Sequence, residues 1–283
     1  MLTPQPDPSP PPPDFQITTT LRYDPALTHT PFLPPSPNPA YYLLPHHLTR
    51  LLASATAFNW PAAIALLSQP RPQALTLLTT HCAKHIPDPS RPYRLRILLA
   101  ATGEITVEAT PLPPPSLAPA HTPLLLLPAE HASFDSLDHC QQQTPWNIYL
   151  DTQPTPPTLF TTHKTTARAA YAAARARAGI DVNTGSPQQD TSPREVLLYN
   201  PAGEVMEGSV TTVYFRRGGR WVTPKAGCGG NVGTSRRYAL ESGVCVEGTV
   251  RVGELVGGER VWLSNGVRGF VPGVLRLGGD CKV

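Results

Sequence analysis

Hydrophobic residues in the first 110 positions recur either at every second position, which predicts strands, or at helical spacing, which predicts helices. Residues 15–23 alternate loosely with β-branched side chains, which predicts a first strand. Beyond Pro45, which suits the first turn of a helix, apolar residues recur at helical spacing. This apolar stripe, which we expect to be buried, consists of Leu48, Leu51, Leu52, Ala55 and Phe58. Two more helices are predicted at residues 62–67 and 72–85, followed by a hairpin at 93–110 that turns at Thr102-Gly103.

The second half of the chain has the pattern of several strands and two helices. Residues 167–178 are rich in alanine and arginine, which favours a helix, and Gly179 is placed to close it. A second helix at 235–241 follows a glycine-rich loop. Strands are predicted at 124–127, 195–199, 204–215, 221–223 and 261–264, with turns at 200–203 and at Asn265-Gly266.

Proline divides the chain into parts. The 36 prolines are more than twice the average share, and many lie in the first residues and between 111 and 157. We predict an α/β (α+β) fold of two domains. Its parts are a disordered proline-rich tail at 1–16, a small N-terminal α/β domain at 17–112, a linker at 113–123 and a larger C-terminal domain at 124–283.

Composition narrows the class of protein. A net charge of +3 gives no basic field of the kind that nucleic-acid-binding proteins carry. The chain has no run of 18 apolar residues to span a membrane, and its first residues lack a secretory signal. Its five cysteines are an odd number without a Cys-x-x-Cys pair, which favours reduced thiols. We therefore expect a cytoplasmic protein without a nucleic-acid or membrane partner.

Lys164 is the first candidate for chemistry. It ends a short apolar and β-branched run, and an Ala/Arg-rich helix follows at once. A lysine at a strand-to-helix junction can be partly desolvated, which lowers its pKa towards the range of a nucleophile. That property is what a lysine needs to form a Schiff base, although a solvated surface charge is the alternative.

A phosphate site is the second candidate. The glycine-rich stretch 227–233 leads into a helix near Ser235, and helix N-termini offer free N–H groups to anions. The stretch matches neither the dinucleotide-binding nor the Gly-Lys-Ser/Thr pattern, and a plain loop is the alternative. Arg50 could add a forked donor to the phosphate, or be a helix-surface charge. Arg22 and Arg94 are candidates for binding substrate carboxylates.

Glu207 is the third candidate. A carboxylate here could keep a pyridine nitrogen protonated, and Gly208 would let a flat ring approach. A solvated glutamate at a strand end is the alternative. Metal sites are not indicated, because Cys82 with His85, and His46-His47, lack a second half at a recognised spacing. Ser54 has no Gly-x-Ser-x-Gly context and no evident base, so the sequence does not support a serine hydrolase.

Taken together, these pieces resemble the class IV (fold-type IV) aminotransferase family from about Thr18 to Pro272. The motifs that carry the resemblance are His47-Leu48-Thr49-Arg50-Leu51, His163-Lys164-Thr165-Thr166-Ala167-Arg168 with Tyr171, Asn200-Pro201-Ala202-Gly203-Glu204-Val205-Met206-Glu207-Gly208-Ser209, Gly233-Thr234-Ser235-Arg236 and Ser264-Asn265-Gly266-Val267-Arg268-Gly269. Within the family, the His-Lys-Thr-Thr and Ser-Asn-Gly-Val-Arg-Gly motifs are most similar to those of aminodeoxychorismate lyases.

The resemblance implies a pyridoxal 5'-phosphate enzyme that works as a homodimer, with the cofactor between its two domains. Lys164 would carry the cofactor and Glu207 would contact its pyridine nitrogen. Arg50 and the N–H groups of Thr234 and Ser235 would hold its phosphate.

Three positions depart from the family pattern. Thr212 stands where asparagine is usual, and Asn231 stands near a position that is often proline. Gly266 falls where branched-chain aminotransferases have a phosphate-binding threonine, so that ligand is absent or replaced by Asn265.

The implied activity is that of a lyase acting on a small molecule, 4-amino-4-deoxychorismate, to give 4-aminobenzoate and pyruvate for folate synthesis. The alternative is a class IV transaminase acting on branched-chain amino acids, D-amino acids or (R)-amines, which would use the same cofactor residues. A further alternative is a pseudoenzyme that keeps the fold as a binding module.

Overall fold

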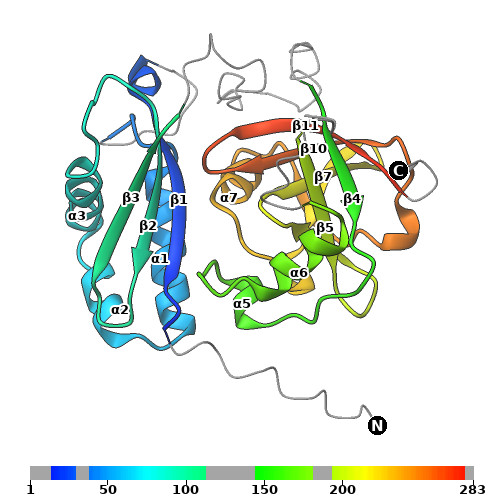
Figure 1. Ribbon diagram of the computed structural model, residues 1–283, viewed down its shortest axis with the longest axis horizontal. Coiled ribbons are helices and arrows are strands. Elements are labelled where there is room, and N and C mark those ends of the chain that lie inside the picture. The colour runs from blue at the N-terminus through cyan, green and yellow to red at the C-terminus, as the bar shows by residue number, and fades with distance from the viewer. Residues whose placement is uncertain (1–13, 30–37, 113–143, 181–192, 278–283) are drawn as a thin grey trace.

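The computed structural model describes residues 14–29, 38–112, 144–180 and 193–277. Helices and strands form two units, each built on its own sheet, as Figure 1 shows. The N-terminal unit has three strands and the C-terminal unit has a curled sheet of eight. The mixed α/β class predicted from the sequence is therefore confirmed.

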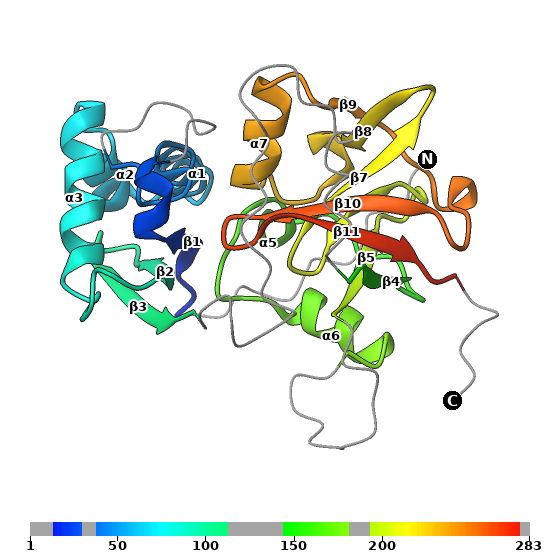
Figure 2. The ribbon, with the colours of Figure 1, turned by 90° about the horizontal axis from the view of Figure 1, so that it is seen from above.

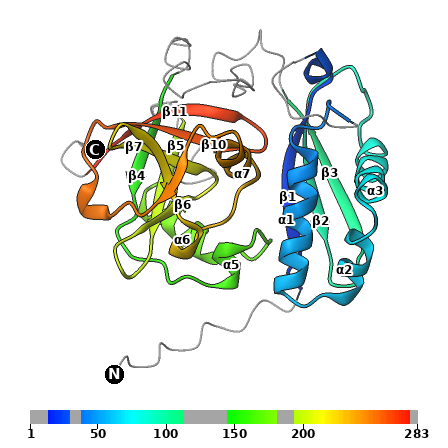
Figure 3. The same cartoon turned by 180° about the vertical axis from the view of Figure 1, so that it is seen from behind.

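The N-terminal unit is an antiparallel sheet in the order β1-β2-β3, covered on one face by helices. Figure 2 shows the helices on one side of this sheet, and Figure 3 shows α1 in front of β1 and β2. Its elements are β1 (Ile17–Tyr23), a 3-10 helix at Pro25–His29, α1 (Leu44–Ala57), α2 (Pro61–Leu67), α3 (Arg71–Ala83), β2 (Tyr93–Leu99) and β3 (Ile105–Pro111).

These elements form where the sequence predicts them. Each of the three helices has a proline at its first or second position, where a missing N–H costs nothing. Leu48, Leu51 and Ala55 are buried in the core of this unit. The hairpin turns at Gly103, whose φ of +86° is the left-handed conformation that glycine adopts without strain.

The C-terminal unit has the strand order β6-β5-β4-β11-β10-β7-β8-β9. Its pairs are antiparallel except for β4 with β5, β4 with β11 and β8 with β9. Helices α6 and α7 lie on opposite sides of the sheet in Figure 2. Its elements are β4 (Trp146–Leu150), α5 (Leu159–Thr162), α6 (Ala169–Arg177), β5 (Arg194–Tyr199), β6 (Val205–Gly208), β7 (Thr212–Arg217), β8 (Arg220–Pro224), a 3-10 helix at Ala226–Cys228, α7 (Thr234–Glu241), β9 (Val246–Gly248), a 3-10 helix at Val252–Glu254, β10 (Arg260–Asn265) and β11 (Gly269–Leu275).

Two expectations about this unit were wrong. The run before Lys164 forms α5, because Thr158 and Thr161 close a capping box, so the lysine does not follow a strand. The single strand predicted at 204–215 is two strands, β6 and β7, because the residues between them bend around the buried carboxylate of Glu195. Strands β4 and β11, which pair with each other in the middle of the sheet, were not predicted from the sequence.

The predicted disordered tail at 1–16 includes a residue that is packed. The ring of Phe15 lies against those of Phe58, Trp60 and Phe160, at centroid distances of 4.9, 5.2 and 5.0 Å. Residues 1–13, the linker 113–123 and the predicted strand at 124–127 lie outside the described residues. The domain boundaries therefore stay a prediction. In the ranges that the structure describes, no helix is both long and apolar enough to cross a bilayer.

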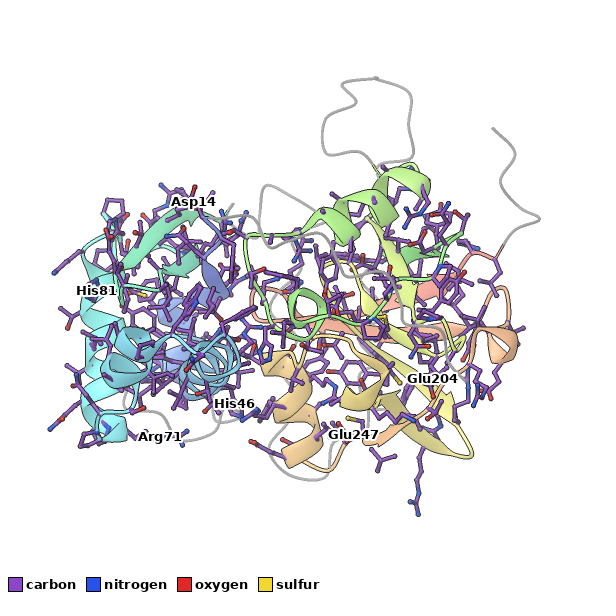
Figure 4. All side chains as sticks on the ribbon, turned by 90° about the horizontal axis from the view of Figure 1, so that it is seen from below. Asp14, His46, Arg71, His81, Glu204 and Glu247 are labelled. Carbon is purple, nitrogen blue, oxygen red and sulfur yellow. The ribbon has the colours of Figure 1, made fainter. Side chains whose placement is uncertain are left out.

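The two units contact each other through apolar and polar residues. Leu27, Tyr42 and Leu43 of the N-terminal unit belong to a cluster with aromatic residues of the C-terminal sheet. His46 on α1 contacts the carboxylate of Glu241 at the end of α7, with 2.8 Å between Nε2 and Oε2. Figure 4 shows His46 on the side of α1 that faces α7. The two units are therefore joined at the ends of α1 and α7.

Candidate active site

Lys164 lies between α5 and α6, in an extended segment that runs beside the first strand. The N–H of Thr18 donates to the Lys164 carbonyl at 2.9 Å, and the N–H of Thr166 donates to the Gln16 carbonyl at 2.9 Å. Because both bonds cross from one unit to the other, the main chain on each side of Lys164 is held by the N-terminal unit.

The surroundings of Lys164 lower the pKa of its amine to about 7. Burial is the main cause, and the positive charges of Arg168 and Arg50 act in the same direction. The negative charge of Glu207 opposes them. An amine with this pKa is about half neutral at pH 7, whereas an ordinary lysine is almost wholly charged there. The lowered pKa is in the direction that a Schiff-base lysine needs, and the catalytic role of Lys164 stays a prediction.

Glu207 is buried on β6, and its position is set by two donors. The hydroxyl of Tyr171 donates to Oε1 at 2.6 Å, and the N–H of Asn231 donates to the same oxygen at 2.8 Å. Burial raises the pKa of Glu207, while these hydrogen bonds and the charges of Lys164 and Arg168 work against that rise. Both donors hold Oε1, which leaves Oε2 to face another group.

Tyr171 is a site residue that the sequence analysis did not assign. Its place on α6 lets the hydroxyl reach both Glu207 and the carbonyl of Thr161, at 2.6 and 3.1 Å. The signal in the sequence was its place in the motif that contains Lys164, because Tyr171 lies seven positions further along, on the helix that follows the extended segment. Arg168 stacks on its ring, with 4.3 Å from the guanidinium carbon to the ring centroid.

Arg50 comes to the same place from α1 of the N-terminal unit. Its guanidinium donates to the hydroxyl of Thr19, and its charge acts on the pKa of Lys164. Burial lowers the pKa of Arg50 to about 10, which Glu207 partly offsets. Among the described residues its buried Nε has no hydrogen-bond partner. A buried guanidinium donor of this kind is suited to an anion.

The glycine-rich loop brings the start of α7 to this place. Gly233 precedes the helix, and Thr234 and Ser235 are its first residues. The Ser235 hydroxyl lies 2.8 Å from that of Ser264, which contacts the Tyr214 hydroxyl at 2.7 Å. The loop can lie this close because it carries glycines. A Cβ on Gly230 would meet the Met206 carbonyl at 2.7 Å, and one on Gly233 would meet Thr212 Oγ1 at 2.8 Å.

Gly208 has a different use from the one the sequence suggested. A Cβ there would lie 2.4 Å from Thr211 Oγ1 and 2.8 Å from Glu195 Oε2, so its missing side chain makes room for the protein itself. The fully buried carboxylate of Glu195 accepts hydrogen bonds from Ser209, Val210 and Thr211. Glu195, which the sequence analysis did not select, therefore shapes the loop that follows Glu207.

Three other predicted residues are not seen to converge on Lys164. The Asn265 side chain accepts hydrogen bonds from the N–H groups of Val267 and Arg268, at 3.0 and 2.9 Å, and so closes its own turn. Arg22 forms an ion pair with Asp24 at 2.7 Å. Arg94 is exposed on β2, directly opposite Arg22 in the strand register. Their roles towards ligands stay predictions.

Ser54, for which no base was evident in the sequence, has a histidine beside it. Its hydroxyl lies 3.1 Å from Nδ1 of His163, the residue before Lys164. The pair comes from positions 109 apart in the chain, so sequence spacing could not indicate it. Because Ser54 is fully buried, the contact positions His163 and the neighbouring Lys164 rather than exposing a nucleophile.

Comparison with known proteins decides the family. The model of the amino-transferase class IV family matches residues 35–274, which is most of the chain. This chain belongs to the amino-transferase class IV family. The resemblance expected from the motifs is therefore confirmed, and the chain is an enzyme of this family.

Class IV relatives include two yeast proteins. Aminodeoxychorismate lyase of Saccharomyces cerevisiae is 31% identical over 200 residues, which cover 65% of this chain and 52% of the yeast protein. The chain thus spans about half the length of that curated relative. A Schizosaccharomyces pombe protein provisionally assigned as an aminodeoxychorismate lyase is 29% identical over 241 residues, covering 83% of this chain and 84% of its own length.

Solved class IV structures share the fold. A hypothetical aminotransferase from Mycobacterium tuberculosis, with α-ketoglutarate and PMP bound, superposes with a TM-score of 0.57 at 17% identity. The match covers 94% of this chain and 84% of that protein. At this identity the likeness supports the fold alone.

Proposed function

We propose that this class IV enzyme is a pyridoxal 5'-phosphate-dependent lyase that cleaves 4-amino-4-deoxychorismate into 4-aminobenzoate and pyruvate, a step of folate synthesis. The observation that carries the proposal is the convergence of Lys164, Glu207 and Arg50 on one site, with the pKa of Lys164 lowered to about 7. The names of the two yeast relatives support the choice of reaction.

The residues of the site fit pyridoxal 5'-phosphate. The buried Nε of Arg50, which has no partner among the described residues, and the N–H groups at the start of α7 suit a phosphate dianion. Glu207 Oε2 suits the pyridine nitrogen, because the two donors hold the other oxygen. Asn265 remains a proposed cofactor contact, through its main chain, because its side chain closes the turn.

Pyridoxal phosphate, when bound, supplies an aldehyde for amines and a ring that takes up an electron pair. Lys164 would bind that aldehyde through its neutral amine. The amine of Lys164, when it is not bound to the cofactor, would be the base that takes a proton from the substrate ring and returns it to the departing enol of pyruvate. The carboxylate of Glu207 would stabilise a proton on the pyridine nitrogen, and that proton makes the cofactor ring a better electron acceptor.

The cleavage of 4-amino-4-deoxychorismate into 4-aminobenzoate and pyruvate needs no second substrate, because the atoms of the two products add up to those of the substrate. Breaking the bond between the ring carbon and the ether oxygen releases pyruvate, and loss of the ring proton makes the product aromatic. The substrate carries two carboxylates, for which Arg22 and Arg94 are the proposed partners. Because Arg22 already pairs with Asp24, Arg94 is the more available of the two. Homodimeric assembly and a cytoplasmic location are also parts of the proposal.

A product assay tests the reaction. The purified chain, supplied with pyridoxal phosphate and 4-amino-4-deoxychorismate, should release 4-aminobenzoate and pyruvate in equal amounts without a keto acid. Amine exchange that needs an added keto acid would identify a transaminase instead. A chain that shows neither activity and gains no visible absorbance from the cofactor would be a pseudoenzyme.

The matched control is Lys164→Ala. This variant should lose turnover and covalent cofactor together, and borohydride followed by peptide mapping should label Lys164 in the wild type. Full activity in the variant, or a label on another lysine, would refute the assignment of Lys164. Size-exclusion chromatography with light scattering measures the proposed dimer.

A further inference from the structure

A buried histidine beside the proposed phosphate site has a donor with no partner. His47 is fully buried on α1, one turn before Arg50. Its Nδ1 lies 2.6 Å from the hydroxyl of Thr19 and 3.5 Å from a guanidinium nitrogen of Arg50. Among the described residues its Nε2 has no hydrogen-bond partner, and neither has Arg50 Nε.

The contacts of His47 determine which nitrogen carries its proton. Arg50 can only donate, so it donates to the Thr19 oxygen and faces Nδ1 as a donor. The Thr19 hydroxyl is then free to donate its own proton to Nδ1. Nδ1 is therefore an acceptor, and burial together with the charges of Arg50 and Lys164 keeps the pKa of His47 well below its usual range. The proton of the neutral ring lies on Nε2.

The Nε2 edge of the ring lies beside the turn that follows β10. A Cβ built on Gly266 would lie 2.8 Å from His47 Cε1 and 3.0 Å from His47 Nε2. The ring edge thus occupies the space where a side chain at 266 would begin. In the family resemblance, this is the position of the phosphate-binding threonine of branched-chain aminotransferases.

The charges around His47 favour an anion. Positive charges on Arg50 and Lys164 act on the ring. Ser264, two residues before Gly266, contacts Ser235 at the start of α7. His47 and Arg50 on α1 and the N-terminus of α7 therefore border one region from two helices.

We propose that His47 Nε2–H is a phosphate ligand of the cofactor and takes the place of the hydroxyl missing at Gly266. The inference rests on the proposed function, because the anion is the phosphate of pyridoxal 5'-phosphate. It adds a ligand from the N-terminal unit, so that α1 contributes both Arg50 and His47 to the same group.

Two amide variants distinguish the role of Nδ1 from that of Nε2. His47→Asn keeps a polar group at the Nδ1 position, facing Thr19, but has no donor at the Nε2 position. His47→Gln reaches the Nε2 position with an N–H donor. Both amides are neutral, so the net charge of the site is the same in the two proteins.

The measurement is the dissociation constant of the apo protein for pyridoxal 5'-phosphate and for pyridoxal, which lacks the phosphate. His47→Asn should bind the phosphorylated form about tenfold more weakly, the scale of one hydrogen bond to a charged group, and bind pyridoxal as the wild type does. His47→Gln should recover most of the loss. Unchanged affinity in His47→Asn, or equal weakening for both ligands, would overturn the inference.

Histidine NMR of the wild-type protein gives a readout that does not depend on a variant folding. Pyridoxine 5'-phosphate, which cannot react with Lys164, should shift the His47 Nε2–H proton downfield, and pyridoxine should not. An unmoved proton overturns the phosphate contact. A wild-type chain that binds none of these compounds would instead refute the proposed function itself.

Discussion

The main-chain N–H of Thr18 donates a 2.9 Å hydrogen bond to the carbonyl of Lys164. Thr18 belongs to the first strand of the N-terminal unit, and Lys164 is the residue of the C-terminal unit whose amine has its pKa lowered to about 7. The distance between the two units at the site is therefore set partly by the main chain, independently of side-chain contacts.

Removing the main-chain N–H of Thr18 should reduce turnover. Thr18→Pro has no N–H to give, so the Lys164 segment loses one of its two main-chain bonds to the N-terminal unit. We expect kcat to fall by about tenfold or more, because small displacements of a reacting group are costly. Thr18→Val is the control, since it keeps the N–H and loses only the side-chain bond to the Ile97 carbonyl. Equal kcat values in the two variants would argue against positioning through the main chain.

The lowered pKa of Lys164 predicts how fast the cofactor attaches at each pH. Only the neutral amine reacts with an aldehyde, so the rate should rise with pH through about 7 and level off above it. Between pH 6 and 8 the neutral fraction increases about tenfold for this pKa, but about a hundredfold, without levelling, for an ordinary lysine. Stopped-flow absorbance of the apo protein with pyridoxal phosphate distinguishes the two curves.

Neutralising Glu207 should affect the reaction more than binding. Glu207→Gln keeps the size of the side chain and can still accept from Tyr171 and Asn231, but it loses the negative charge. We expect the cofactor to bind while kcat falls by about a hundredfold, the scale of one electrostatic contact in an active site. A steady-state assay with saturating cofactor measures this fall. An unchanged kcat would count against Glu207 as the partner of the ring nitrogen.

Tyr171 should act on the reaction through Glu207. Its hydroxyl stabilises the charged carboxylate, so Tyr171→Phe should raise the pKa of Glu207 further and make the acid form more common at a given pH. Activity should then be lost at higher pH as the solution is acidified, which a pH profile of kcat reports. Tyr149→Phe, on β4, is the control for a general effect of losing a hydroxyl. If kcat of both variants falls at the same acidic pH as in the wild type, Tyr171 does not affect the pKa of Glu207.

The packing of Gly208 predicts a loss of stability. Gly208→Ala places a Cβ 2.4 Å from Thr211 and 2.8 Å from Glu195, and the loop must move to accept it. Overpacking of this kind costs about 1–3 kcal/mol of unfolding free energy. Gly257→Ala is the matched control, because a Cβ there would meet no atom within 4 Å. Urea denaturation compares the stability of the two variants. Equal midpoints would mean that the loop accommodates the added Cβ at position 208 without a loss of stability.

Much of the N-terminal unit could be predicted because its signals are local. The spacing of Leu48, Leu51 and Ala55 and the turn at Gly103 involve residues close in the chain. Strand β4 could not be predicted in the same way. Its five residues become a central strand only by pairing with β5 and β11, which lie far along the sequence. The short run before Lys164 was misjudged because a capping box outweighed its β-branched residues.

The sequence by itself determined the family to which this protein belongs. A lysine before an Ala/Arg helix, a glutamate beside Gly208 and a glycine-rich loop before a helix are recognisable as motifs, and they placed the chain in the correct family. Only the tertiary structure decided what surrounds them. The shift in the pKa of Lys164, the donors on Glu207 and the orientation of His47 arise from groups that are distant in sequence. Burial and charge act through space, and folding alone brings those groups within a few ångströms of one another.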